Sequence, residues 1–146
     1  LRPLRPGALA GLTVADFDAR TSSLVIDRDK ANVGRQLLLP QSTANFFVQK
    51  AAAKPRSAPL FARENGKAWD KDAWKLPIKA AASAADLPAG TTAYTLRHST
   101  ITDLVVDRLD LLTIALVSGT SVKMIEKHYG HLQKKRAAEA LSNLFI

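Results

Sequence analysis

From residue 41 to residue 145, apolar side chains recur at the spacing of amphipathic helices, and the pattern breaks at loops rich in proline, glycine or aspartate. Before this region, residues 22–28 and 35–39 are rich in branched apolar side chains and flank a run of turn residues. Residues 22–39 therefore predict a β-hairpin with Lys30 close to its turn. We expect a mainly α-helical chain with one small antiparallel β-sheet, an α+β fold.

In the C-terminal third, the sequence predicts a helix that starts near Thr92 or Thr95. Three short helices are expected after it. Residues 111–117 are apolar on nearly every side, which is typical of a short buried helix. Residues 118–121 end that helix and cap the next, which we expect to run to about Lys127. A last amphipathic helix is expected over about 134–145.

Composition narrows the class of protein. The chain has 146 residues, with 21 Lys and Arg against 13 Asp and Glu, and its net charge of +8 favours a polyanionic partner such as nucleic acid. No cysteine is present, which excludes disulfides and thiolate metal sites. The histidines do not have a metal-binding pattern, and no apolar run is long enough to cross a membrane. We expect a cytoplasmic protein and, because the only methionine is Met124, a piece of a longer chain.

All three histidines and both tyrosines lie between residues 94 and 131. If a helix begins near Thr95, Tyr94 and Arg97 lie close to one face of its first turn, where the helix dipole favours an anion. Arg97 can then form two hydrogen bonds with a phosphate. The alternative is an ordinary salt bridge from Arg97 and a packed Tyr94 ring.

A second pattern lies in residues 112–129. Ala115, Gly119 and Ile125 stand at the spacing of a helix-turn-helix, with a small residue at the helix crossing and a glycine in the turn. The segment 123–136 adds five Lys or Arg against one Glu, which indicates either phosphate contacts or a solvated face.

Taken together, these segments resemble the catalytic domain of the tyrosine recombinase (phage integrase) family. The family's first box, Gly-Leu-Arg-Pro-Gly-Glu, is similar to residues 3–9, which read Pro-Leu-Arg-Pro-Gly-Ala-Leu. Its second box, His-x-Leu-Arg-His-Thr, is similar to residues 94–99, which read Tyr-Thr-Leu-Arg-His-Ser. Its third box, Leu-Gly-His, is similar to residues 117–120, which read Val-Ser-Gly-Thr, and Tyr129 keeps the family's spacing of nine residues after Thr120.

The resemblance implies a site-specific DNA recombinase that acts through a 3′-phosphotyrosyl intermediate without a metal or cofactor. Arg5 and Arg97 would clamp the scissile phosphate, Lys30 would protonate the leaving 5′ oxygen, and Tyr129 would attack phosphorus. The implied partners are double-stranded DNA and further copies of the chain in a tetramer, with the protein on the nucleoid when it is bound to DNA. Members of the family carry a DNA-clamping domain and further helices before the first box, so residues 1–146 are expected to be an N-terminally truncated, partial catalytic domain.

Three positions depart from the family pattern. Ala8 replaces an acidic residue, and Tyr94 and Thr120 replace the histidines of the second and third boxes. Tyr94 can still hydrogen-bond the phosphate, and Thr120 is a shorter donor, so both remain predicted site residues. Two alternatives stay open: a type IB topoisomerase, which shares the chemistry, and a decayed or non-enzymatic DNA-binding protein that uses the helix-turn-helix-like segment 112–129.

Overall fold

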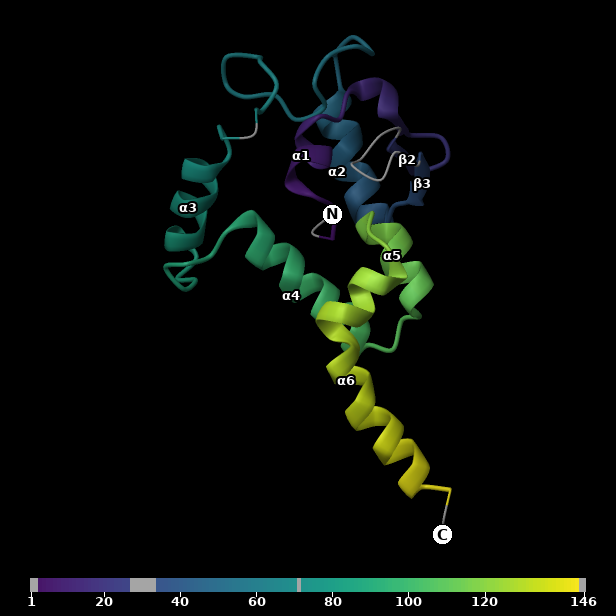
Figure 1. The fold of residues 1–146 in the computed structure, drawn as a ribbon. Helices are drawn as coiled ribbons and strands as arrows, with labels where there is room; N and C mark the ends of the chain where they lie inside the picture. The colour runs from purple at the N-terminus through teal and green to yellow at the C-terminus, as the bar shows by residue number, and fades with distance from the viewer. Residues whose placement is uncertain (1–2, 27–33, 71, 145–146) are drawn as a thin grey trace.

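The computed structural model describes residues 3–26, 34–70 and 72–144 (Figure 1). No helix in these ranges is long and apolar enough to cross a membrane. The described elements, in chain order, are α1 (Pro6–Ala10), a 3₁₀ turn (Val14–Asp16), β1 (Phe17–Asp18), β2 (Ser23–Ile26), β3 (Arg35–Leu38), α2 (Gln41–Ala51), α3 (Lys75–Ala84), α4 (Ala93–Val106), α5 (Leu111–Ser118) and α6 (Val122–Ser142). The predicted mainly α-helical fold with a small antiparallel sheet is confirmed.

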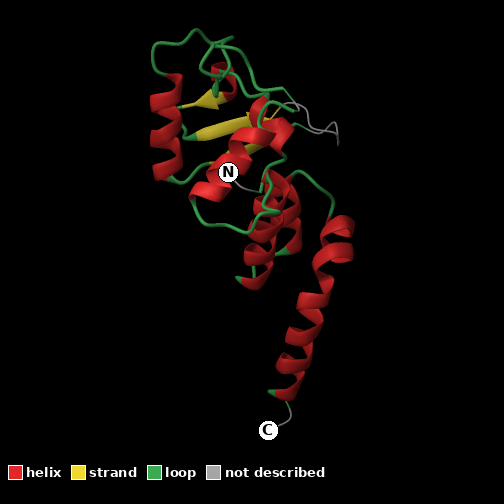
Figure 2. Cartoon of the chain, turned by 90° about the vertical axis from the view of Figure 1, so that its left-hand side faces the viewer, coloured by secondary structure: helices red, strands yellow, loops and turns green. Residues whose placement is uncertain are grey.

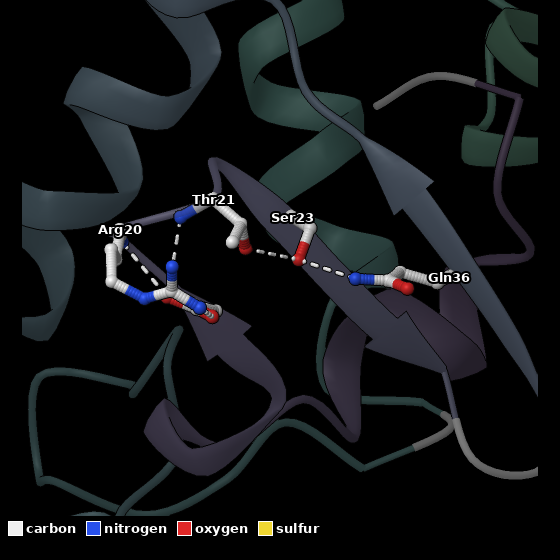
Figure 3. Close-up of polar contacts among 5 residues, drawn as sticks. Arg20, Thr21, Ser23 and Gln36 are labelled. Carbon is white, nitrogen blue, oxygen red and sulfur yellow. Dashed lines mark hydrogen bonds and ion pairs between the residues drawn. The ribbon is translucent and has the colours of Figure 1, made fainter.

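The sheet has three antiparallel strands in the order β1-β2-β3. The expected hairpin supplies β2 and β3, whose register pairs Ser23 with Leu38 and Ile26 with Arg35. Gln36 donates a hydrogen bond of 2.9 Å from Nε2 to Ser23 Oγ, a cross-strand contact that supports this register (Figure 3). The two-residue strand β1 was not predicted, because two residues show no alternation. Lys30 falls outside the described residues.

One hydrophobic core joins the sheet to α1 and α2. Phe47 of α2 packs edge-on against Phe17, with ring centroids 5.4 Å apart, and against Phe61, at 5.2 Å. The buried members of this core are Leu4, Leu12, Phe17, Leu24, Ile26, Leu39, Ala44, Phe47 and Leu60. Because Leu4 is one of them, the residue before Arg5 is anchored in the core.

A second core joins α4, α5 and α6. Its buried members are Ile101 and Val105 from α4, Ile114 and Ala115 from α5, and Ile125 and Tyr129 from α6. In α4 and α6 the buried pair lies four residues apart and therefore on one side of the helix, and in α5 the two buried residues are adjacent. This core fixes how α4 and α6 lie relative to each other.

The C-terminal helices differ from the prediction. A helix ending near Lys127 and a separate one over about 134–145 were expected, but α6 runs continuously from Val122 to Ser142. Gly130, the residue that most weakens the helix pattern, costs only about 1 kcal/mol inside a helix, and no proline follows it. The C-terminal half of α6 extends away from the rest of the molecule, and the strands lie at the opposite end (Figures 1 and 2).

Helix α5 is not buried on every side, contrary to expectation. Ile114 is fully buried and Ala115 nearly so, but Leu112 and Leu116 are 61% and 54% exposed. The helix has only eight residues and packs against α4 and α6 on one side. A nearly all-apolar helix therefore leaves two leucines in solvent, one helical turn apart.

Candidate active site

Helix α4 carries Arg97 into the interior between the two cores. Thr92 caps this helix in a reciprocal box with Thr95: the Thr95 backbone N–H donates to Thr92 Oγ1 at 3.1 Å, and the Thr92 N–H donates to Thr95 Oγ1 at 3.2 Å. The predicted helix start is therefore confirmed. Arg97 lies in the second turn and is only 7% exposed.

Two backbone carbonyls hold the Arg97 guanidinium. Its Nη1 donates to the carbonyl oxygen of Ser118 at 2.8 Å and also to the carbonyl oxygen of Pro3. Pro3 lies two residues before Arg5, and Ser118 lies two residues before Thr120. The Arg97 side chain therefore ties together the first, second and third boxes of the sequence.

Positive charge gathers around Arg97. Its pKa is lowered, chiefly by burial and then by the positive charge of Arg5 and, to a smaller extent, of Arg35. We call Arg5, Arg35 and Arg97 the arginine cluster. Like charges held close in a partly buried place repel one another, and an anion between them would relieve that repulsion.

Arg5 is placed by the local sequence. It is the N-cap of α1 in an extended conformation, with φ −66° and ψ 137°, and Pro6 follows at the first helical position. The residue before a proline is restricted to this region of φ and ψ, so the Leu-Arg-Pro order favours the observed backbone at Arg5. Its side chain is half-buried.

Tyr129 projects from α6 toward α4 and is 8% exposed. A hydrogen bond of 2.5 Å joins its hydroxyl to Nδ1 of His98, the residue that follows Arg97. Burial raises the pKa of the Tyr129 phenol, and the positive charge of Arg97 acts in the opposite direction. The buried phenol therefore lies within the electrostatic influence of Arg97.

The turn between α5 and α6 places Thr120. Gly119 ends α5 in the left-handed conformation, with φ 65°, and the Thr120 N–H donates to the Ala115 carbonyl at 3.0 Å. Thr120 itself is half-buried. The helix pair expected for residues 112–129 is therefore formed, with Ala115 and Ile125 buried between the helices.

The predicted site residues differ in how far they are buried and in which of them interact. Tyr94, in the first turn of α4, is 54% exposed and interacts electrostatically with Arg97. Arg5, Arg97 and Tyr129 are electrostatically linked, and Thr120 lies on the turn whose Ser118 carbonyl binds Arg97. Lys30 lies outside the described residues.

Two residues that neighbour the site, His98 and Arg35, were not predicted from the sequence. His98 stands next to Arg97, but its contact with Tyr129 spans 31 residues and depends on how α4 and α6 cross. Arg35 is an ordinary strand residue in the pattern of the hairpin. The register of the hairpin determines where Arg35 lies: it is the first residue of β3 and pairs with Ile26.

The family model of the phage integrase family matches residues 3–136, and the chain belongs to this family. A search of curated protein sequences finds no match.

Solved structures agree on the fold. The integrase of the Tn1549 transposon, in complex with transposon right-end DNA, superposes with a TM-score of 0.80 at 19% identity over 99% of this chain and 56% of that one. XerA recombinase gives a TM-score of 0.75 at 18% identity over 94% of this chain and 54% of that one. XerH site-specific recombinase bound to a palindromic difH substrate gives 0.70 at 22% identity over 97% and 42%. The chain thus spans about half the length of these proteins.

Proposed function

We propose that this chain forms part of the catalytic domain of a site-specific DNA recombinase, which cleaves and exchanges strands of double-stranded DNA through a 3′-phosphotyrosyl intermediate. The observation that carries the proposal is the electrostatic grouping of a buried arginine, Arg97, with a second arginine, Arg5, and a buried tyrosine, Tyr129. A guanidinium pair suits the non-bridging oxygens of a phosphodiester, and the phenol is a nucleophile that needs no cofactor.

The proposed reaction conserves the phosphodiester bond energy. Arg5 and Arg97 bind the non-bridging oxygens and stabilise the charge that develops on them in the transition state. The Tyr129 oxygen forms a bond to phosphorus, the bond from phosphorus to the 5′ oxygen breaks, and Lys30 supplies a proton to that oxygen. A 5′ hydroxyl from another strand then attacks the phosphotyrosine and releases Tyr129, which completes the exchange.

Tyr94 and Thr120 have supporting roles in this proposal. The exposed Tyr94 hydroxyl is free to turn toward a phosphate bound at the arginine cluster, and Thr120 offers a short donor from the turn after Gly119. Neither is a good proton acceptor at neutral pH, so both act by hydrogen bonding to the phosphate.

The long helix α6 supports an assembly on DNA. Lys123, Lys127 and Lys134 are exposed on it and are suited to contacts with the phosphate backbone. Near the end of the described chain, Leu141 and Leu144 are 56% and 74% exposed on a segment that extends from the body (Figure 1). We propose that this segment docks on a neighbouring copy in a tetramer that assembles on nucleoid DNA in the cytoplasm.

The test uses the full-length protein and a nicked suicide substrate, from which the short fragment that bears the new 5′ hydroxyl diffuses away after cleavage. We expect a protein–DNA adduct that survives denaturation, is lost in Tyr129→Phe, and forms more slowly in Tyr94→Phe. Tyr94 and Tyr129 are the two tyrosines of residues 1–146, so the pair of variants distinguishes between them.

DNA binding is measured in parallel by a salt titration. Affinity that falls steeply with salt, together with loss of the adduct in Tyr129→Phe alone, would support the proposal. If the wild-type protein binds the substrate but forms no adduct, the proposal that it is an enzyme is contradicted. That result would favour a non-enzymatic DNA-binding protein that uses the helix pair of α5 and α6.

A further inference from the structure

His98 occupies a position that the reaction as described does not use. We propose that His98 is a catalytic residue, the general base that removes the proton from the Tyr129 hydroxyl. This inference rests on the proposed function, because it assigns the proton acceptor for the same nucleophile.

The contact between the two side chains carries the inference. His98 Nδ1 and the Tyr129 hydroxyl oxygen are 2.5 Å apart, so the two atoms are in direct hydrogen-bond contact, as a general base and its proton donor must be. The rings are tilted by 36°, with centroids 6.1 Å apart, so they meet at their polar atoms rather than face to face. When Nδ1 carries no proton, the hydroxyl donates to it, and this is the arrangement that proton transfer needs.

The surroundings explain why the phenol needs a base. Burial raises the pKa of Tyr129, so little phenolate exists near neutral pH. Arg97 favours the phenolate by its charge, but a buried guanidinium does not accept a proton. His98 is exposed, so a proton taken from Tyr129 can pass on to water.

His128 is placed less well. His128 neighbours Tyr129 in the chain, but their ring centroids are 6.4 Å apart and His128 is exposed. In the hydrogen bonds recorded for the described part of the chain, Tyr129 is joined to His98. The family's two box histidines are Tyr94 and Thr120 here, and neither side chain is a good proton acceptor at neutral pH.

The step balances as follows. The proton moves from the Tyr129 oxygen to His98 Nδ1 while the Tyr129 oxygen bonds to phosphorus and the bond to the 5′ oxygen breaks. The 5′ oxygen takes its proton from Lys30. In the return reaction the incoming 5′ hydroxyl gives a proton to Lys30, the bond from Tyr129 to phosphorus breaks, and the Tyr129 oxygen recovers its proton from His98.

The first test is kinetic and uses the full-length protein on the suicide substrate under single-turnover conditions. We expect His98→Asn to cleave about 10²- to 10⁴-fold more slowly. The asparagine keeps an oxygen acceptor near the place of Nδ1 but cannot take a proton near neutral pH. The matched control His128→Asn keeps the wild-type rate. Imidazole added to His98→Ala restores a measurable part of the rate, which a purely structural role would not allow.

The pH profile provides a second readout. The wild-type rate falls as pH drops through the range in which imidazoles gain a proton, and His98→Asn loses this dependence. Arg97 acts on Tyr129 through its charge, and His128 lies beside the Tyr129 ring. The variant His128→Asn tests whether the neighbouring imidazole contributes to the profile.

A third readout needs no activity. We compare the ¹⁵N spectra of the wild-type protein and the Tyr129→Phe variant. We expect the Nδ1 resonance of His98 to move between them and the Nδ1 resonance of His128 to stay in place. An unchanged His98 resonance, or cleavage by His98→Asn within threefold of the wild-type rate with the same pH profile, would overturn the inference. In the latter case the adduct at Tyr129 remains, so the proposed function stands. Absence of an adduct in the wild-type protein would overturn both.

Discussion

Arg97 of α4 donates a hydrogen bond of 2.8 Å from Nη1 to the carbonyl oxygen of Ser118, the last residue of α5. The same nitrogen reaches the carbonyl oxygen of Pro3, at the start of the described chain. A side chain expected to clamp phosphate is therefore also a structural link among three segments. Its fixed position is the kind of preorganisation that electrostatic catalysis requires.

Arg97→Lys should impair both roles. A lysine ammonium cannot reproduce the planar geometry that serves the carbonyls and a phosphate together, so we expect adduct formation to slow by about 10²- to 10³-fold. An unsatisfied buried carbonyl should cost about 1–3 kcal/mol in a urea titration. Arg20→Lys, at a side chain 85% exposed, is the control. Equal behaviour of the two variants would contradict the role of Arg97.

The arginine cluster should make the protein sensitive to anions. Sulfate bound among Arg5, Arg35 and Arg97 relieves their repulsion, and at ten times its dissociation constant it adds about 1.4 kcal/mol to the free energy of unfolding. For a domain of this size that raises Tm by about 3–6 °C. The shift is measured against chloride at equal ionic strength. It should shrink in Arg5→Ala and persist in Arg20→Ala, and a shift of the same size in both variants would exclude the cluster as the site.

The second core should depend strongly on Ile125. This side chain is 1% exposed between α4, α5 and α6, so Ile125→Ala should lower the free energy of unfolding by about 2–5 kcal/mol. Met124, its neighbour, is 43% exposed, and Met124→Ala should cost much less. Urea titrations compare the two variants, and similar losses would mean that the packing of α6 against α4 and α5 is described wrongly.

The turn before Thr120 depends on glycine. Gly119 has φ 65°, a conformation that costs other L-residues about 1–2 kcal/mol. Gly119→Ala should therefore lower Tm, and Gly119→Asn should lower it less, because asparagine tolerates this region better. Thermal unfolding of both variants measures the difference. If alanine is tolerated as well as asparagine, the left-handed turn is not required.

The raised pKa of Tyr129 predicts a stability change at alkaline pH. A group with a raised pKa in the folded state contributes stability that is present below its unfolded value of about 10 and is lost as pH rises through the folded value. The difference in stability between the wild-type protein and Tyr129→Phe should therefore be constant up to about pH 9 and should fall above pH 10. A difference that grows with pH would mean that the folded state favours the phenolate.

Local signals predicted much of this structure. The Thr92 cap, the glycine that ends α5 and the hairpin strands all depend on residues within a few positions of one another, so the sequence pattern contains them. The spacing from Arg97 to Tyr129 likewise comes from the sequence boxes. The continuity of α6 through Gly130 was missed, because the propensity of one glycine is weak beside the helix that surrounds it.

The contacts of the site were beyond local signals. The contact of His98 with Tyr129 depends on the crossing of α4 and α6, and the electrostatic effect of Arg35 on Arg97 depends on how the sheet is placed relative to α4. Neither follows from periodicity, which gives the face of an element but not its distant neighbour.

The central claim, that Tyr129 is the nucleophile, is tested most directly by identifying the residue that carries DNA. The adduct formed on the suicide substrate is digested with trypsin and nuclease and examined by mass spectrometry. Trypsin separates the two tyrosines, leaving one in the peptide 80–97 and the other in the peptide 128–134. We predict a nucleotide attached to Tyr129 in the peptide 128–134. A nucleotide on Tyr94, or on any residue other than tyrosine, would contradict the account.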